Sequence, residues 1–139
     1  MVFIPRKQKF KKSQKRRSFL KVNSVVTLNK LKFGSFALKS IEPGVLTSKQ
    51  IESMFQSINK IIKKSGRIIL RVFSHEPVCK KPIEVRMGKG KGNVSHWVAK
   101  ITAGTLLCEL ESKFPFLVLK AFKLAQIRLP IKTKIIIQK

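Results

Sequence analysis

The chain has 139 residues, enough for one domain with a buried core but too few for two. Apolar residues make up 43% of it, which excludes a chain that is disordered throughout. Lys and Arg number 31 against six Glu and no Asp, so the formal net charge is +25. Such a charge favours a polyanionic partner, either nucleic acid or an anionic membrane. No stretch approaches the roughly 18 consecutive apolar residues of a membrane-spanning helix, so nucleic acid is the favoured partner.

The amino-terminal segment is strongly basic, because residues 1 to 41 contain no acid and the first 21 positions carry nine basic residues. Repulsion between these charges predicts a segment that is extended in water and becomes ordered on RNA. A cleaved mitochondrial presequence has the same composition, so composition alone leaves both interpretations open. The candidate rRNA-binding residues are Arg6, Lys7, Lys9, Phe10, Lys11, Lys12, Lys15, Arg16 and Arg17.

The first half of the predicted domain is a strand followed by a helix. Residues 33–41 predict a strand that is buried on much of both faces, and residues 42–44 predict a turn. Thr47 and Gln50 form a capping-box pattern that opens the helix, and Gly66 is expected to cap its end. The apolar stripe of this helix is typical of a core-facing surface rather than of a cofactor site. It consists of Ile51, Met54, Phe55, Ile58, Ile61 and Ile62.

The second half is richer in strand patterns. Strands are predicted at residues 67–73, 83–86 and 131–137, with a loop or edge around Pro77 and Pro82. Residues 97–101 and 105–110 predict a hairpin around Ala103-Gly104, and residues 114–129 a helix ended by Pro130. We therefore expect an α+β fold, with two helices packed on a mostly antiparallel sheet. A basic extension, 1–31, would precede a single domain, 32–139.

One loop combines three glycines with three cations: Arg86, Met87, Gly88, Lys89, Gly90, Lys91, Gly92 and Asn93. Glycine allows close approach of the backbone to another surface, and the lysines attract phosphate, so the loop is predicted to contact RNA. Its spacing matches neither a P-loop nor a dinucleotide-binding fingerprint. A solvated hairpin loop is the alternative interpretation.

Residues 85–93, followed by Trp97-Val98-Ala99, resemble the most characteristic stretch of the bacterial-type ribosomal protein L-sixteen family. Further similar segments follow the family order and extend over most of the chain. They are residues 5–12, 33–36, 46–52, 71–73, 121–125 and 129–133.

The resemblance implies a structural protein of the large ribosomal subunit, held between rRNA helices beside the aminoacyl-tRNA site. The basic amino terminus and the loop 86–93 would reach toward the peptidyl-transferase region and help to position tRNA. The implied partners are large-subunit rRNA, tRNA in the aminoacyl site and neighbouring large-subunit proteins, with no membrane. In some bacteria the arginine that matches Arg86 is hydroxylated.

The resemblance also bears on the compartment. Family members begin with a similar basic segment near their initiator methionine, so residues 1–12 are expected to belong to the mature protein. This favours a bacterial or organelle-encoded protein over an imported one. The abundance of Lys, Ile and Phe favours a mitochondrial ribosome, with a plastid or a bacterial cytoplasm as alternatives. Cys79 and Cys108 are expected to be reduced.

The chain departs from the family pattern in three places. Where the family has a glycine-containing basic stretch, residues 18–32 carry Phe19, Leu20, Val22, Val25, Val26 and Leu28, and Ser95-His96 replaces an acid and an aromatic residue. The start of the second helix is apolar where the family is rich in glutamate. We hypothesise that Phe114, Phe116 and Leu119 there meet an organelle-specific neighbour protein, with extra core as the alternative.

Other classes of function fit less well. The two histidines, two cysteines and six glutamates match no known catalytic or zinc pattern, so no enzyme, metal, cofactor or small-molecule substrate is expected. Binding to a lipid surface would explain the charge but not the glycine loop. An RNA chaperone or DNA-binding protein would explain both, but not the ordered set of family segments.

Overall fold

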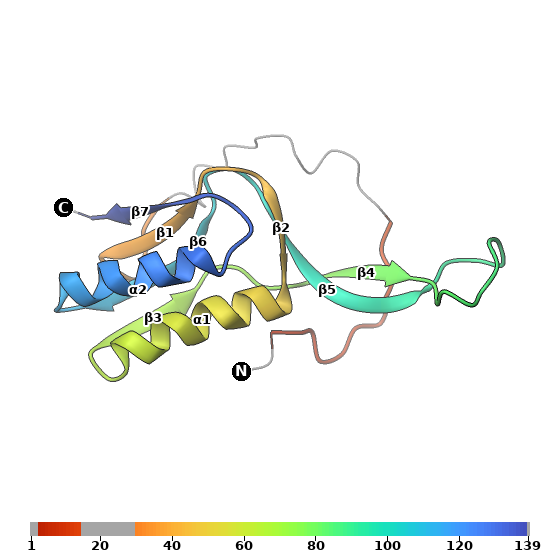
Figure 1. Ribbon diagram of the computed structural model, residues 1–139, viewed down its shortest axis with the longest axis horizontal. Helices are drawn as coiled ribbons and strands as arrows, with labels where there is room; N and C mark the ends of the chain where they lie inside the picture. The colour runs from red at the N-terminus through yellow and green to blue at the C-terminus, as the bar shows by residue number, and fades with distance from the viewer. Residues whose placement is uncertain (1–2, 15–29, 139) are drawn as a thin grey trace.

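The computed structural model of the chain describes residues 3–14 and 30–138 (Figure 1). These residues form seven strands and two helices. In chain order they are β1 (Phe36–Ser40), β2 (Gly44–Thr47), α1 (Ser48–Ile62), β3 (Gly66–Leu70), β4 (Glu76–Lys80), β5 (Asn93–Ile101), β6 (Leu106–Ser112), α2 (Pro115–Ile127) and β7 (Thr133–Ile137).

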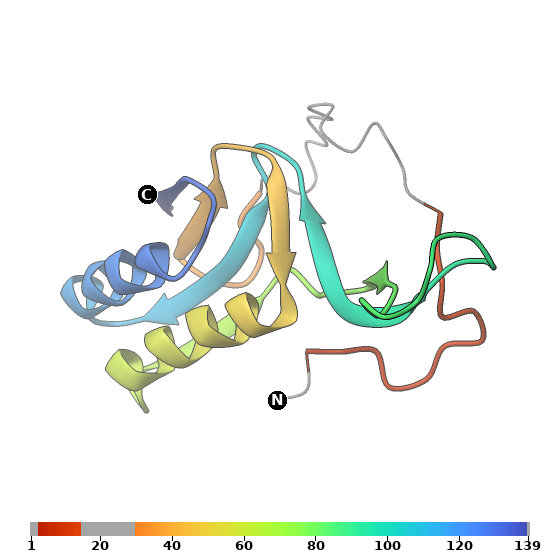
Figure 2. The same ribbon diagram turned by 45° about the vertical axis from the view of Figure 1, so that its right-hand side comes forward.

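The strands form two antiparallel sheets. One has four strands in the order β3-β6-β1-β7, and the other has three in the order β2-β5-β4. Helices α1 and α2 pack against each other beside the four-stranded sheet, as both views show (Figures 1 and 2). This confirms the predicted α+β class with two helices on antiparallel sheet. The division of the strands between two sheets was not predicted.

The core lies between the helices and the four-stranded sheet. On the sheet, Leu38 pairs with Cys108, and Phe36 with Leu110, so these side chains share one face. Burial raises the pKa of the Cys108 thiol to about 12, so this cysteine stays neutral. The helices contribute a buried stripe each: Ile51, Met54, Ile58 and Ile62 from α1, and Val118, Ala121, Phe122 and Ala125 from α2.

Helix α1 begins as predicted but ends differently. Thr47 and Gln50 form the capping box, each side chain accepting a hydrogen bond from the other's backbone N–H at 3.3 and 2.9 Å. The predicted cap at Gly66 is wrong, because Lys63 caps the helix with a φ of 49°. Gly66 instead opens β3, where a Cβ would lie 2.5 Å from the Glu111 carbonyl oxygen. Close packing of β3 on β6 explains this glycine better than capping does.

The predicted hairpin of residues 97–101 and 105–110 is also wrong. Strands β5 and β6 follow one another along the chain but belong to different sheets. The turn itself is present, with Gly104 at a φ of 90°. Its N–H donates to the Ser40 carbonyl at 2.8 Å, and the Ser40 N–H donates to the Thr105 carbonyl at 2.9 Å. The chain therefore crosses between the sheets at two neighbouring points, after β1 and after β5.

One further predicted strand is absent from the structure, and one predicted edge is present. Residues 83–86 form no strand in the structure, and Ile83 and Val85 there are exposed. Without a pairing partner or a buried face, a short apolar run has nothing to hold it extended. Pro77 lies in β4, which is an edge strand, in agreement with the edge interpretation.

A buried carboxylate joins the four-stranded sheet to the segment that precedes it. Glu109 in β6 is fully buried, and one of its oxygens accepts hydrogen bonds from three successive backbone N–H groups, those of Lys32, Phe33 and Gly34, at 3.0, 2.6 and 3.1 Å. Its other oxygen pairs with the Arg71 guanidinium. Burial acts to raise the pKa of Glu109, but these N–H groups and the guanidinium together hold it below its ordinary value. Glu109 is therefore ionised at neutral pH.

Candidate nucleic-acid interface

An arm projects from the body of the molecule and carries the glycine-rich loop at its tip (Figures 1 and 2). Its length comes from β5, which has two pairing partners. The inner residues 98–101 pair with β2, whereas the outer residues 93–98 pair with β4. The outer part therefore extends beyond the body with β4 alone beside it, and residues 81–92 close the end.

The backbone of the loop shows why it needs glycine. Gly88, Lys89 and Gly90 have φ values of 96°, 52° and 89°, three successive residues in the region that glycine adopts most readily. Nothing lies within 4 Å of a Cβ added at Gly88 or Gly90, so their requirement is conformational. Gly92 differs, because a Cβ there would lie 2.6 Å from the Lys80 carbonyl oxygen. It allows the two strands of the arm to approach each other.

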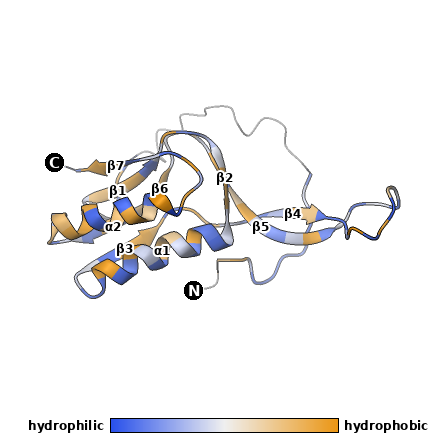
Figure 3. Ribbon diagram, in the orientation of Figure 1, coloured by the Kyte–Doolittle hydropathy of each residue, from blue (hydrophilic) through white to orange (hydrophobic). Residues whose placement is uncertain are grey.

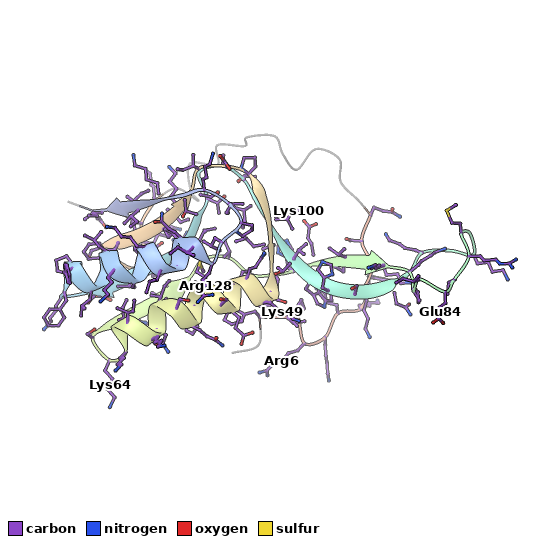
Figure 4. The ribbon with its side chains drawn as sticks, viewed as in Figure 1. Arg6, Lys49, Lys64, Glu84, Lys100 and Arg128 are labelled. Atoms are coloured by element: carbon purple, nitrogen blue, oxygen red, sulfur yellow. The ribbon has the colours of Figure 1, made fainter. Side chains whose placement is uncertain are left out.

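The tip of the arm is exposed and basic. Arg86, Lys89 and Lys91 are exposed, and Met87 is 99% exposed. The Lys81 ammonium donates to the Gly88 carbonyl and so braces the turn from within the loop. One acidic residue of the loop, Glu84, is also exposed (Figure 4).

The amino-terminal segment, residues 3–14, runs beside the arm in both views (Figures 1 and 2). At its start, Phe3 is buried against the core, with its ring centroid 6.0 Å from that of Phe55. The Ser74 hydroxyl donates to the Phe3 carbonyl and fixes the backbone there. Beyond Phe3 the segment is mainly hydrophilic, with Ile4 and Phe10 as exposed apolar residues (Figure 3). It exposes Arg6, Lys7, Lys9, Phe10, Lys11 and Lys12.

Two lysines fasten this segment to the loop. The Lys12 Nζ donates to the Lys91 carbonyl at 3.0 Å, and the Lys91 Nζ donates to the Ser13 carbonyl. The two basic stretches that the sequence singled out separately are thus adjacent in space. Of the predicted residues, Lys15, Arg16 and Arg17 lie outside the described residues.

A groove separates the amino-terminal segment from the outer part of β5. The segment contributes Pro5, Arg6, Gln8, Lys11 and Lys12, and β5 contributes Asn93, Val94, Ser95 and Trp97. None of these lining residues is acidic. Sequence analysis missed Gln8, Ser95 and Trp97 as candidate site residues. Simple alternation along β5 could not have indicated them, because the pairing with β4 passes from Val78 and His96 to Cys79 and Val94 and leaves Ser95 as an extra residue in the strand.

The described part of the chain offers little for other chemistry. It contains no group of three or more His, Cys, Asp or Glu residues that could hold a metal ion. Neither α1 nor α2 is long and apolar enough to cross a membrane. The exposed basic residues of the segment and the arm suit a phosphate-rich partner.

The chain is similar to known proteins over most of its length. Residues 5–136 match the family model described as ribosomal protein L16p/L10e. The chain is 48% identical to the large ribosomal subunit protein uL16 of Wigglesworthia glossinidia brevipalpis over 130 residues, 93% of this chain and 92% of the relative. It is 46% identical to the protein of the same name from Blochmanniella pennsylvanica over 98% of both chains. The corresponding Acinetobacter baylyi protein is 44% identical over 95% of this chain and 94% of its own.

Proposed function

The chain belongs to the ribosomal protein L16p/L10e family, and as a structural protein of the large ribosomal subunit we propose that it binds rRNA beside the aminoacyl-tRNA site and helps to position tRNA. Its partners are rRNA and other proteins of the large subunit. Its role there is structural rather than enzymatic, as in its relatives.

The proposed binding of rRNA and tRNA rests on the contact between Lys12 and Lys91. The hydrogen bonds that these two lysines donate hold the basic amino-terminal segment against the basic arm, so that ten cationic side chains lie on two adjacent stretches. These are Arg6, Lys7, Lys9, Lys11, Lys12, Lys80, Lys81, Arg86, Lys89 and Lys91. Like charges held together in this way repel one another unless phosphates neutralise them. The arrangement supports a site where rRNA surrounds the segment and the arm.

The shape of the arm supports a division of roles within the site. The segment lies against the side of the arm and would contact the surrounding rRNA. The tip, residues 86–93, extends farthest from the body (Figure 1), and so suits a ligand that arrives after assembly, such as tRNA. Three residues with positive φ give this tip a defined backbone shape before binding, which lowers the entropy lost when a ligand binds.

Ultraviolet crosslinking in native ribosomes tests this proposal. We expect peptides from residues 3–14 to be crosslinked to large-subunit rRNA near the peptidyl-transferase region, and peptides from residues 86–93 to be crosslinked to that rRNA or to tRNA. Sequencing of the attached RNA and mass spectrometry of the peptides identify both sides of each crosslink. Crosslinks confined to the helices, or to rRNA far from the aminoacyl-tRNA site, would contradict it.

The compartment is part of the proposal. The Lys-, Ile- and Phe-rich composition supports a mitochondrial ribosome, whereas the bacterial relatives support a bacterial cytoplasm equally well. Mass spectrometry of ribosomes purified from the host decides between them, because a mitochondrial form copurifies with the mitochondrial ribosomes of a eukaryotic host and a bacterial form with the ribosomes of a bacterium.

A further inference from the structure

We propose that the groove between residues 5–12 and the outer part of β5 binds one unpaired nucleotide of RNA, with its base against Trp97 and its phosphate on the basic residues of the opposite wall. This inference rests on the proposed rRNA binding and adds to it a specific subsite. The groove has a volume of about 480 Å³, within the range of about 300–1,000 Å³ that is usual for small-ligand sites.

The β5 wall offers a surface for a base. Trp97 is half-buried, so part of its indole ring is available while strand pairing with Pro77 fixes its backbone. Unpaired bases stack on aromatic rings in this way, largely irrespective of their identity. Asn93 and Ser95 lie on the same wall, and their side chains can donate to and accept from the edge of a base. This wall therefore has both the flat and the polar components of a base-binding site.

The opposite wall offers a surface for phosphate. Arg6, Lys11 and Lys12 line it, and no acidic residue lines the groove. Lys12 uses one ammonium hydrogen to reach the Lys91 carbonyl at 3.0 Å. A lysine ammonium has three donors, so Lys12 can hold the walls together and contact a phosphate at the same time. The groove is thus fixed before RNA binds.

Duplex RNA does not fit this arrangement as well as an unpaired nucleotide. The bases of a duplex are stacked on each other, and its outer surface presents phosphates and hydroxyls. Such a surface could meet Arg6 and Lys11 but could not place a base face on a half-buried indole. Trp97 therefore has a role only if the nucleotide leaves the helical stack.

The composition of the chain makes this testable by fluorescence. Trp97 is the only tryptophan and the chain has no tyrosine, so the intrinsic emission reports on the groove alone. We would titrate the full chain with a ten-nucleotide oligouridylate and with an RNA duplex of equal phosphate number. We expect quenching of Trp97 by the oligouridylate and little by the duplex. Equal quenching by the two would overturn the proposal.

Substitutions provide a second readout. Trp97→Leu keeps an apolar side chain but removes the stacking surface, and is expected to weaken oligouridylate binding at least about fivefold. Trp97→Phe keeps an aromatic ring and should stay within about twofold. Thermal unfolding shows whether each variant is folded. Lys60→Ala in α1 is the control for a loss of oligouridylate binding that is unrelated to the groove. If the Leu variant is folded and binds as tightly as the wild type, the groove has no stacking role.

Failure of this inference is distinguishable from failure of the proposed function. Filter binding of the same proteins to isolated large-subunit rRNA and to an unrelated RNA of equal length measures their preference for large-subunit rRNA. If the wild type prefers large-subunit rRNA and the Trp97 variants do so equally, rRNA binding stands and the groove proposal falls. If the wild type shows no preference, the proposed function itself is contradicted.

Discussion

Arg71, which directly follows β3, forms an ion pair with Glu109 in β6, although 38 positions separate them in the chain. The Glu109 side chain has no exposed surface and that of Arg71 is 15% exposed. The Arg71 guanidinium also lies 5.7 Å from the centre of the Phe33 ring, while Glu109 holds the backbone of residues 32–34. The pair therefore fixes the place where the chain enters the domain after its basic extension.

We predict that Glu109→Gln destabilises the protein by about 3 kcal/mol. An amide presents only one acceptor oxygen to the three backbone N–H groups and the guanidinium, so buried donors lose their partner. Urea denaturation measures the change. Glu42→Gln is the matched control, because the Glu42–Lys132 pair is exposed and should contribute less than about 1 kcal/mol. Equal losses in the two variants would show that Glu109 has no special role.

The same carboxylate predicts a loss of stability in acid. Because the pKa of Glu109 is lower in the folded chain than the ordinary value of 4.5, its ionised form favours the folded state. This stabilisation is complete above pH 4.5 and is lost as the pH falls through the lowered pKa. Unfolding free energies measured between pH 7 and pH 3 should show the loss in the wild type and a weaker dependence in Glu109→Gln. Identical pH profiles would contradict the assignment.

Two glycines of the arm should respond differently to substitution. Gly92→Ala places a methyl group against the Lys80 carbonyl and should separate β4 from outer β5. Hydrogen exchange followed by mass spectrometry is expected to be faster across both strands. Gly88→Ala meets no neighbouring atom and strains only its own φ, at a cost of about 1–2 kcal/mol, so faster exchange should be confined to residues 81–92. Protection of β4 that is unchanged in Gly92→Ala would refute the close-packing explanation.

The tip lysines are predicted to act on tRNA rather than on folding. Lys89→Ala with Lys91→Ala should leave thermal stability within about 0.5 kcal/mol, as is usual for exposed sites, while weakening tRNA accommodation or subunit maturation. Sedimentation profiles and the rate of peptide synthesis by purified ribosomes measure the two effects. The control is Lys60→Ala with Lys64→Ala, which removes equal charge at the opposite end of the molecule (Figure 4). Normal maturation and normal synthesis in the tip variant would count against the proposal.

The apolar start of α2 is expected to be covered in the assembled subunit. Phe114 and Phe116 are 55% and 76% exposed, whereas Leu119 is half-buried. Phe116→Ser should preserve the stability of the chain, in contrast to Phe122→Ala in the core, which should cost about 3–5 kcal/mol. Hydroxyl-radical footprinting should show Phe116 protected in the subunit. Equal labelling in the subunit and in the free chain would exclude a neighbour there.

Local sequence patterns predicted the helices better than they predicted which strands and side chains contact each other. The stripe of α1 and its capping box lie within a few residues of one another, and the structure confirms both. The hairpin prediction failed because a turn at Gly104 indicates that the chain reverses there, but not which strands β5 and β6 will pair with. The position of this turn depends on Ser40, which lies more than 60 positions away and hydrogen-bonds to Gly104 and Thr105. Glu109 was missed as a structural residue for the same reason, since its partners lie 38 to 77 positions away.

The candidate interface was predicted in part. Glycine and lysine content indicated the loop, and charge indicated the amino-terminal segment, because each is a property of consecutive residues. Their adjacency through Lys12 and Lys91 could not be predicted, since 79 positions separate them. Trp97 indicated only the family, because its place on one wall of the groove depends on the irregular pairing of β5 with β4.

The double pairing of β5 has a mechanical consequence. Its inner residues 98–101 pair with β2 and are mostly buried in the body, while its outer residues 93–97 pair with β4 alone, so the arm behaves as a beam fixed at one end. A force applied at the tip is transmitted along β5 and, where Val98 pairs with Thr47, through β2 to the start of α1. Bending is easiest in the outer half, because residues 93–97 lack the buried contacts of Val98, Ala99 and Ile101. A molecule that pushes on residues 86–93 therefore deflects the arm first and reaches the helices last.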